Sequence, residues 1–240
     1  MKQRYHYGPV RSRRLGRSLG VDVMPHKTCS LDCIYCECGA TSLLTLERKE
    51  YLPTQEIIDD LDQYLKKGPE LDYITFAGSG EPTLHSGLGK IINFLKEKYP
   101  QFKVAVLTNA TLLNDPMVID DLQKADLVVP SLDGVSTQAF EKMNRPAANI
   151  TPETIISGIK NLKENFSGEI WLEIFIIPEI NDSEEELALF KETIEKLGIK
   201  KVQLNTLDRP GAVEELKPVS QEYKDEIAQK LGQVEIVNRK

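Results

Sequence analysis

Short apolar runs alternate with longer amphipathic stretches along almost the whole chain. The apolar runs predict strands, and the amphipathic stretches predict helices, because their apolar residues recur on one helical face. The predicted strands cover residues 19–24, 73–77, 103–108, 127–131, 170–177 and 201–205, with a further edge strand expected at 233–237. The predicted helices cover residues 54–67, 87–98, 116–124, 136–143, 151–165, 183–197 and 220–231.

This alternation predicts an α/β fold, because strands that are joined through helices pair in parallel through right-handed crossovers. Six strand–helix units fall short of the eight that close a full barrel. No repeat, low-complexity segment or long linker divides the sequence. We therefore predict a single domain over residues 1–240, with a basic N-terminal arm at 1–18, the strand–helix core at 19–206 and a C-terminal extension at 207–240.

The net charge of −7 is distributed unevenly. Six of the 30 basic residues precede the first acidic one, which leaves 24 basic against 37 acidic residues in the rest of the chain. Such an arm can contact nucleic acid or another phosphate. It can also bind the protein's own carboxylates, or a small anionic ligand, across the mouth of the fold. We favour this second reading, because one short arm is weak evidence of nucleic-acid binding.

No apolar run is long enough to span a bilayer, and the N-terminal residues lack the hydrophobic region of a signal peptide. We therefore expect a soluble, cytoplasmic protein. All four cysteines lie between Cys29 and Cys38. A disulfide framework would spread its cysteines along the chain, so this grouping indicates metal ligands in a reducing compartment.

Cys29, Cys33 and Cys36 follow the spacing C-x3-C-x2-C in the segment after the first predicted strand. Three thiolates on one loop can bind one side of an iron–sulfur cluster, which normally takes four. One iron then keeps an open coordination position, which is typical of a metal site that performs chemistry. The fourth cysteine, Cys38, is interpreted as a spare thiol, a fourth ligand of a zinc site, or a residue that acts on substrate.

Polar residues and glycines follow the later predicted strands, where ligands gather in parallel α/β proteins. After the second, third and fourth strands, these residues are Gly78, Ser79, Gly80, Glu81, Asn109, Ser131 and Asp133. Each of them can also be read as a turn residue or a helix cap.

Glu173 is the only charged residue in the apolar run at 170–177. A buried carboxylate needs a partner, so its side chain must reach a pocket, solvent or a cation. An arginine of the N-terminal arm and Arg145 are the candidate cations. A structural ion pair and a contact with a ligand are equally compatible with the sequence.

The cysteine spacing, with the aromatic Tyr35 before the third cysteine, resembles the cluster motif of the radical S-adenosylmethionine (SAM) enzymes. This resemblance implies a TIM-like partial (β/α)6 barrel with a single [4Fe-4S] cluster on Cys29, Cys33 and Cys36, and SAM on the open iron. It also implies reductive cleavage of SAM to a 5′-deoxyadenosyl radical. The electron would come from a partner such as ferredoxin or flavodoxin.

The resemblance assigns roles to the residues that follow the strands. In the family a Gly-Gly-Glu stretch holds the amino group of SAM. Here Ser79 replaces the first of the paired glycines, and Gly80 and Glu81 keep the pattern. Ile177 begins the stretch that resembles the adenine-flanking segment of the family. The other cofactor-binding positions are Tyr35, Gly78, Asn109, Ser131, Asp133 and Glu173.

Several further segments, among them 7–21 and 203–210, resemble one prokaryotic branch of radical SAM proteins without an assigned reaction. That branch is related to the wybutosine-synthesis enzymes, which build a tricyclic base on transfer RNA. The present chain has no cysteines for a second cluster. The candidates for contact with an unidentified substrate are Arg145, Asn205, Asp208 and Arg209.

Two alternatives remain open. In one, the chain modifies RNA and uses the basic arm to hold transfer RNA. In the other, Cys29, Cys33, Cys36 and Cys38 form a closed zinc site in a binding module without enzymatic activity. The glycine-rich stretch after the second strand favours the radical SAM reading, because a zinc module leaves this stretch without explanation.

Overall fold

The parallel sheet that the sequence predicts is present in the computed structural model, which describes residues 3–238. Six strands lie side by side in the order in which they occur in the chain, and neighbouring strands are parallel. They are β2 (Gly16–Val21), β5 (Tyr73–Phe76), β6 (Lys103–Thr108), β7 (Leu127–Pro130), β8 (Glu169–Ile176) and β9 (Lys201–Thr206). Only β2 departs clearly from its predicted bounds, because it starts at Gly16 rather than at residue 19.

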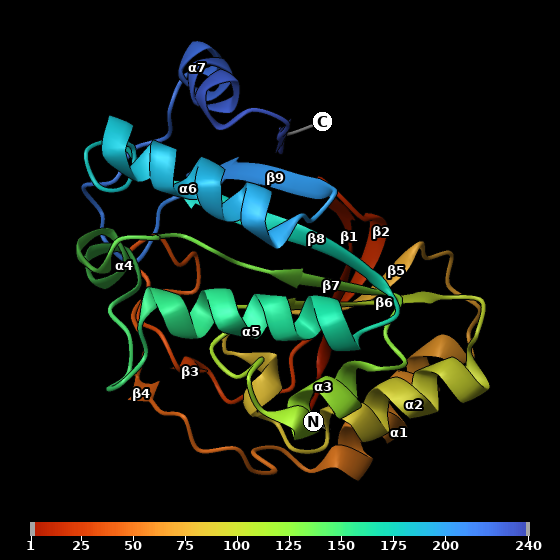
Figure 1. The fold of residues 1–240 in the computed structure, drawn as a ribbon. Helices are drawn as coiled ribbons and strands as arrows, with labels where there is room; N and C mark the ends of the chain where they lie inside the picture. The colour runs from red at the N-terminus through yellow and green to blue at the C-terminus, as the bar shows by residue number, and fades with distance from the viewer. Residues whose placement is uncertain (1–2, 239–240) are drawn as a thin grey trace.

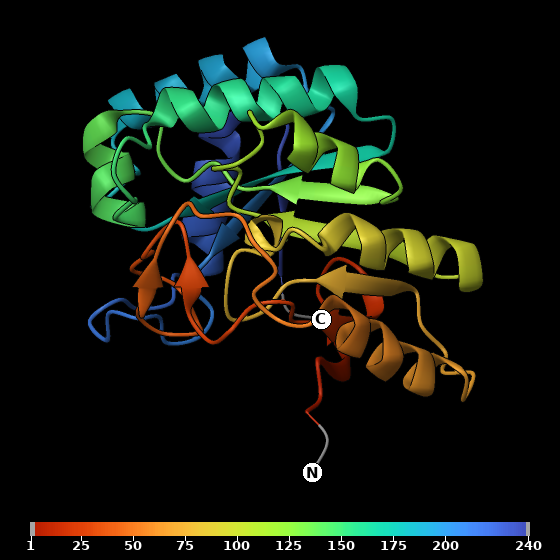
Figure 2. The ribbon, with the colours of Figure 1, turned by 90° about the horizontal axis from the view of Figure 1, so that it is seen from below.

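Helices connect successive strands and cover the outer face of the sheet (Figures 1 and 2). They are α1 (Thr54–Leu65), α2 (Leu88–Lys98), α3 (Pro116–Leu122), α4 (Thr137–Asn144), α5 (Pro152–Asn165), α6 (Glu184–Leu197) and α7 (Gln221–Leu231), with a short 3-10 turn, η1 (Pro82–Leu84), before α2. Each α-helix corresponds to a predicted one. Leu61 and Leu95 on the helices are fully buried in one core with Ile74 and Val104 of the strands. Among the described residues, no helix combines the length and the apolar composition that a membrane span requires.

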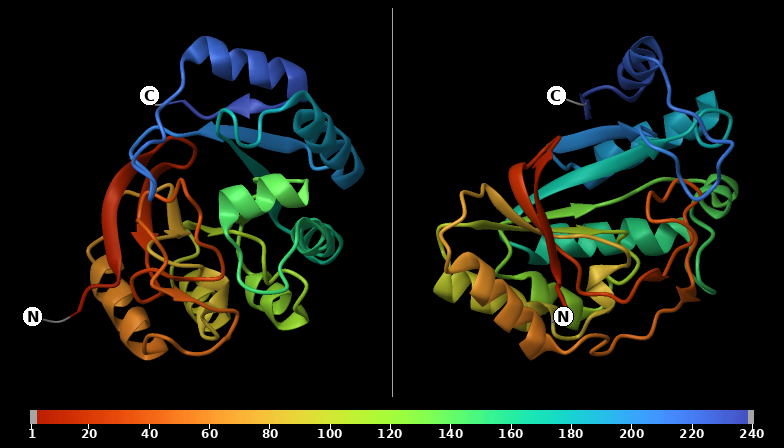
Figure 3. Two further views of the ribbon diagram at one scale, coloured as in Figure 1. Left: turned by 90° about the vertical axis from the view of Figure 1, so that its left-hand side faces the viewer. Right: turned by 180° about the vertical axis from the view of Figure 1, so that it is seen from behind.

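The sheet is curved, and its inner face forms the inside of a partial barrel (Figure 3, left). Successive side chains of a strand point to opposite faces, so residues two apart share a face. Part of the inner face is filled by a small apolar cluster of Leu15, Ala105, Leu127 and Val129. Trp171 packs against this cluster, and Glu173 lies two residues further along the same face of β8. The single charge in this apolar run therefore points into the barrel.

Residues 6–12 and 16–18 of the predicted N-terminal arm belong to strands of the sheet. β1 (His6–Ser12) pairs antiparallel with β2 through a tight hairpin, and most of its residues are exposed. No pattern in the sequence indicated β1, because Gly8, Pro9 and Arg11 interrupt any alternation of apolar and polar residues. At the other edge, β10 (Glu235–Ile236) pairs with β9, as predicted.

Two arginines at the tip of the β1–β2 hairpin reach across the open side of the barrel to strands far away in the sequence. Arg14 Nη1 donates to the carboxylate of Glu173 on β8. Arg13 Nη1 donates to the carboxylate of Asp208 and to Asn205 Oδ1 (3.3 Å). These arginines bind the protein's own carboxylates, as the favoured reading of the charge pattern expected. The partner of Glu173 is an arginine of the arm.

We expect Arg14→Met to destabilise the fold by about 3 kcal/mol, because Glu173 would keep its charge inside the barrel without a cation. The double variant Arg14→Met/Glu173→Leu should recover most of this loss, since it leaves no unpaired charge. Urea unfolding followed by circular dichroism measures both changes. The control is Arg11→Met on the exposed strand β1, which should change the free energy of unfolding by less than about 0.5 kcal/mol. An Arg14→Met variant as stable as wild type would refute this role.

Candidate functional site

The three motif cysteines lie in the long loop between β2 and α1, at the carboxyl end of the sheet. Cys29 belongs to β3 (Thr28–Cys29), which pairs with β4 (Leu43–Leu44) in a separate small sheet (Figure 1). Cys33 and Cys36 lie in the segment between these strands, where the Cys36 amide donates to the Cys33 carbonyl oxygen (3.1 Å). The three motif cysteines are partly buried, whereas Cys38 is exposed.

Each motif cysteine accepts one hydrogen bond from a side-chain nitrogen. The three bonds run from Lys27 Nζ to Cys36 Sγ (3.1 Å), from Asn109 Nδ2 to Cys29 Sγ (3.4 Å) and from Asn144 Nδ2 to Cys33 Sγ (3.3 Å). The donors come from the cysteine loop itself, from the end of β6 and from the end of α4. Three separate parts of the fold therefore fix the positions of the three sulfurs.

The protein sets the pKa values of these thiols differently. Burial raises the pKa of Cys29 to about 11 and also raises the pKa of Cys33. A hydrogen bond from the Cys38 thiol, followed by the one from Lys27, lowers the pKa of Cys36 to about 5. At neutral pH only Cys36 is then a thiolate in the metal-free protein. Metal binding must displace the protons of the other two, as it does at thiol sites in general.

The loop after β5 braces the cysteine loop from one side. Gly80 packs so closely that an added Cβ would lie 2.3 Å from the carbonyl oxygen of Thr28, so only glycine fits. Ser79 donates to Asp22 Oδ2 through its amide (3.0 Å) and its hydroxyl (2.6 Å). Gly78 has no room for a side chain against the same aspartate. The predicted glycine-rich stretch is thus in contact with the cysteine loop.

Glu81 joins the ends of β5 and β6. Its carboxylate is 3% exposed and accepts hydrogen bonds from the Thr83 amide (3.0 Å) and hydroxyl (2.6 Å), the Thr108 hydroxyl (2.7 Å) and the Asn109 amide (2.8 Å). The last of these bonds holds the residue whose side chain reaches Cys29. The observed role of Glu81 is to position this donor, and the role at the amino group of SAM stays a prediction.

Asp133, Tyr35 and Asn144 form a buried network between the cysteine loop and the end of β7. Asp133 Oδ2 accepts hydrogen bonds from the Tyr35 hydroxyl and from Asn144 Nδ2 (3.0 Å). The Tyr35 ring stacks on Phe175 of β8, with centroids 4.0 Å apart. Asp133 Oδ1 is buried and has no hydrogen-bond partner among the described residues. An unpaired buried acceptor is a feature of a site that a ligand completes.

The remaining predicted cofactor positions lie at the same end of the sheet. Ile177 is buried, and its amide donates to Asn181 Oδ1 (2.7 Å). It packs in a second apolar cluster with Ile34 of the cysteine loop. Ser131, just after β7, forms a backbone bridge with Glu173 of β8, so these two positions lie side by side.

Three of the four substrate candidates, Asn205, Asp208 and Arg209, lie near the hairpin tip, and Arg145 lies apart from them. Asn205 and Asp208 meet at the hairpin, where both accept from Arg13. Arg209 forms an ion pair with the glutamate that follows the third motif cysteine (2.9 Å). Arg145 is the left-handed C-cap of α4, and its exposed side chain lies 3.8 Å from an aspartate of the cysteine loop. The contact of all four with a substrate stays a prediction.

The site also includes Lys27, Asn144, Asp22 and Tyr7, which the sequence does not predict. Tyr7 lies on β1, and its hydroxyl donates to the carbonyl oxygen of Ala77 after β5 (3.2 Å). Only Lys27 could have been suggested by its position, two residues before the motif. The other three are brought to the site by pairing and packing that no local pattern indicates.

The sequence profile of the radical SAM superfamily matches residues 23–190, a segment that contains the three motif cysteines. The chain belongs to the radical SAM superfamily. This confirms the resemblance, and the partial barrel predicted from it is confirmed by the parallel sheet and by the solved structures described below. Membership in the radical SAM superfamily implies an iron–sulfur cluster and SAM as cofactors.

Relatives of this radical SAM chain include two UPF0026 proteins. UPF0026 protein MJ1312 of Methanocaldococcus jannaschii is 34% identical over 214 residues, which cover 88% of this chain and 66% of that protein. UPF0026 protein slr1464 of Synechocystis sp. is 38% identical over 205 residues, which cover 85% and 76%. A longer protein of Brachyspira hyodysenteriae, named GTPase Obg, is 40% identical over 222 residues, which cover 92% of this chain but 32% of that protein.

Solved structures share the fold over most of the chain. SuiB of Streptococcus suis bound to S-adenosylmethionine aligns over 92% of this chain and 50% of its own, with a TM-score of 0.64 and 17% identity. A radical SAM methyltransferase of Sphaerobacter thermophilus aligns over 91% and 66%, with a TM-score of 0.66 and 18% identity. TYW1 with a lysine-pyruvate adduct aligns over 90% and 72%, with a TM-score of 0.62 and 18% identity. At sequence identities of 17–18%, this structural similarity establishes the fold alone.

The donor set at the cysteines fits an iron–sulfur cluster. Three thiols within eight residues can each bind a different iron of one cluster. N–H donors at the sulfurs are part of the usual surroundings of such clusters.

We expect wild-type stability to fall, relative to Asp133→Asn, as the pH rises from 4 to 7. Burial raises the pKa of Asp133 to about 6, against about 4 in the unfolded chain. The folded protein therefore favours the protonated carboxyl. The protonated Asp133 carboxyl contributes about 2–3 kcal/mol to the free energy of unfolding. This contribution is complete below about pH 4 and is lost as the pH rises through 6. Urea unfolding of both proteins across this range measures the difference. A difference that does not change with pH would contradict the assignment.

Proposed function

We propose that this radical SAM protein holds one [4Fe-4S] cluster on Cys29, Cys33 and Cys36 and cleaves SAM reductively at it. When bound, the cluster and SAM supply a 5′-deoxyadenosyl radical, which removes a hydrogen atom from an unidentified substrate. The observation that carries the proposal is the side-chain N–H donor at each of the three sulfurs, at the carboxyl end of a partial barrel. Such donors stabilise thiolate charge.

The chain's own residues give this site its rigidity. Glu81 holds the Asn109 backbone, and the Asn109 side chain holds Cys29. Asp133 orients Asn144, whose amide also reaches Cys33. When the residues that contact the metal ligands are themselves held by further hydrogen bonds, the site keeps its geometry during catalysis. These contacts support a catalytic rather than a merely structural cysteine loop.

We propose ferredoxin or flavodoxin as the electron donor and the cytoplasm as the location. Cys38 is exposed and lies two residues after Cys36, so the cysteine loop reaches the surface where a donor protein could approach. All four cysteines are free thiols, which suits a reducing compartment.

RNA modification is a weaker candidate. Arg13, Arg14 and Arg17 of the arm are ion-paired within the protein, so fewer charges are available for phosphates than the sequence suggests. Deleting residues 1–17 would remove β1 and the start of β2, and therefore would not test RNA binding alone. Membership in an enzyme superfamily favours an enzyme over the zinc-binding module.

Anaerobically reconstituted protein given dithionite and SAM should form 5′-deoxyadenosine, measured by liquid chromatography with mass spectrometry. Cys33→Ala should form none above background, because the cluster would lose one of three ligands. Cys38→Ala is the matched control and should retain the cluster and most of the product. Product from Cys33→Ala, or a protein that contains zinc and no iron, would overturn the proposal.

Lys27→Met should shift the reduction potential of the cluster to a more negative value by roughly 50 mV, which corresponds to about 1 kcal/mol for one electron. The variant removes a positive donor 3.1 Å from Cys36 Sγ, and the reduced cluster carries the extra negative charge. A redox titration followed by electron paramagnetic resonance measures the shift. Lys49→Met, on an exposed side chain, should leave the potential unchanged. Equal potentials in Lys27→Met and wild type would exclude a role of Lys27 at the cluster.

A further inference from the structure

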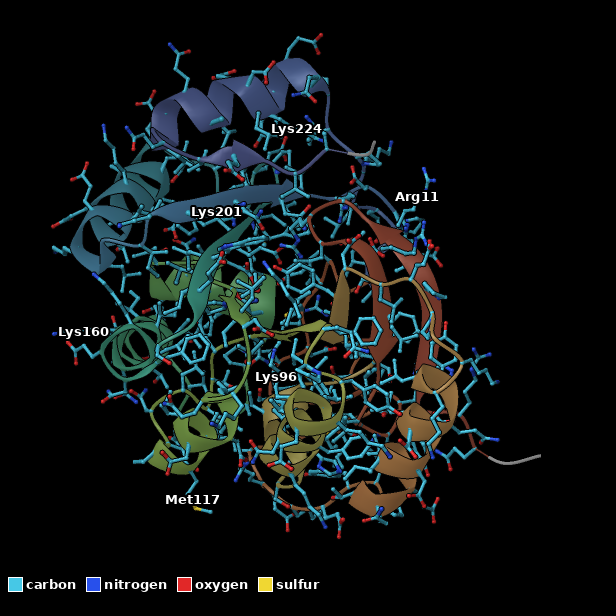
Figure 4. All side chains as sticks on the ribbon, turned by 90° about the vertical axis from the view of Figure 1, so that its right-hand side faces the viewer. Arg11, Lys96, Met117, Lys160, Lys201 and Lys224 are labelled. Atoms are coloured by element: carbon cyan, nitrogen blue, oxygen red, sulfur yellow. The ribbon has the colours of Figure 1, made fainter. Side chains whose placement is uncertain are left out.

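A cavity of about 530 Å³ lies at the open side of the barrel, and five of its ten lining residues are arginines. The β1–β2 hairpin supplies four of these arginines, and the segment after β9 supplies the fifth. They are Arg11, Arg13, Arg14, Arg17 and Arg209. Figure 4 labels Arg11 at the hairpin end, close to the C-terminal segments. The radical SAM mechanism does not by itself require such a concentration of guanidinium groups.

Carboxylates hold two of these guanidinium groups in place. Arg14 Nη1 donates to Glu173 and to Gln203 Oε1 (3.3 Å), and Arg13 Nη1 donates to Asp208 and Asn205. The Nε and Nη2 atoms of both arginines form no hydrogen bond with the described residues. These nitrogens are also not fully buried, so a ligand can reach them. A guanidinium has five N–H donors, so three on each side chain remain for a ligand.

The other arginines of the cavity are available to an anion. The Arg11 side chain is exposed and forms no ion pair or hydrogen bond with any residue in 3–238. Arg17 and Arg209 pair with Glu70 and Glu37, and their side chains are 49% and 68% exposed. Exposed ion pairs contribute little stability, so a ligand anion can replace the carboxylate.

The cavity also borders the cysteine site. Glu37, which lines the cavity, directly follows Cys36 in the sequence. Glu173, which holds Arg14, faces the inside of the barrel, near enough to interact electrostatically with Tyr35 and Asp133. A ligand bound by its anionic group in the cavity would therefore extend toward the mouth of the barrel.

We propose that this arginine-lined cavity binds the phosphate or diphosphate group of a small phosphorylated substrate. The fork of an arginine side chain matches two oxygens of a phosphate, and preformed forks bind with little further ordering. The volume is that of a small-molecule site. The role of the ligand as substrate rests on the proposed function, whereas the binding of the anion does not.

A nucleic acid fits these observations less well than a small ligand. Beyond the six basic residues of the arm, the chain has 24 basic and 37 acidic residues. An extended polyanion would leave the cavity and meet this negative surface, where it would be repelled. Asp72 and Asp208 on the cavity wall are bonded to the Arg17 amide and to Arg13, so they do not oppose an anion inside it.

Inorganic pyrophosphate is the probe, titrated by isothermal titration calorimetry into the reconstituted protein at low ionic strength. We expect saturable binding that weakens about tenfold in Arg11→Gln and in Arg13→Lys, because each variant removes a fork. Lys160→Gln, an exposed cation on α5 (Figure 4), is the matched control and should bind as wild type. Arg11 has no partner within the described residues, so Arg11→Gln tests the cavity without disturbing the fold.

Absence of saturable binding, or equal affinity in wild type, Arg11→Gln and Arg13→Lys, would overturn the proposal. Binding of a transfer RNA that depends on Arg11, without binding of pyrophosphate, would overturn it in favour of an RNA ligand. The 5′-deoxyadenosine assay is run on the same samples. Pyrophosphate binding without SAM cleavage would refute the proposed function but support the anion site. SAM cleavage without pyrophosphate binding would support the proposed function and refute the anion site.

Discussion

A barrel of six parallel strands does not close, and the gap beside β2 would open its inner face to water. In this protein the β1–β2 hairpin occupies the gap. Leu15 at its tip joins an apolar cluster inside the barrel, and Arg14 next to it neutralises Glu173 on β8, 159 residues further along the chain. A carboxylate in this position is tolerated only because a cation reaches it. The interior of the barrel therefore depends on one ion pair between distant segments.

The cysteine loop depends on the barrel in the same way. Its small sheet of β3 and β4 has only two residues in each strand, too few to hold three sulfurs in place. Asparagines at the ends of β6 and α4 supply this restraint through their side-chain amides. Asn109 is itself held by the buried Glu81. Hydrogen bonds from the ends of rigid elements thus fix the positions of the cysteines in a loop that has little regular structure of its own.

The hairpin links these two parts of the molecule. The carboxylates that bind Arg13 and Arg14 close the barrel, and both arginines line the cavity. A locally positive cavity on a chain with a net charge of −7 attracts small anions while the rest of the surface repels large ones. The contacts that stabilise the fold are therefore also the ones that define which ligands can approach the cysteine loop.

The sequence alone determined the order and type of the main elements, because the periodicity of apolar residues reports which face of each element is buried. It also determined the cysteine motif, whose three ligands lie within a few residues of one another. It did not determine β1, which has no alternating apolar pattern and is a strand because it pairs with β2. Nor did it determine that Asn109, Asn144 and Lys27 each meet a different sulfur. The arginines of the arm were visible in the sequence, but their partners were not. Ion pairs and hydrogen bonds between distant residues leave no periodic trace in the chain, so only the tertiary structure decided them.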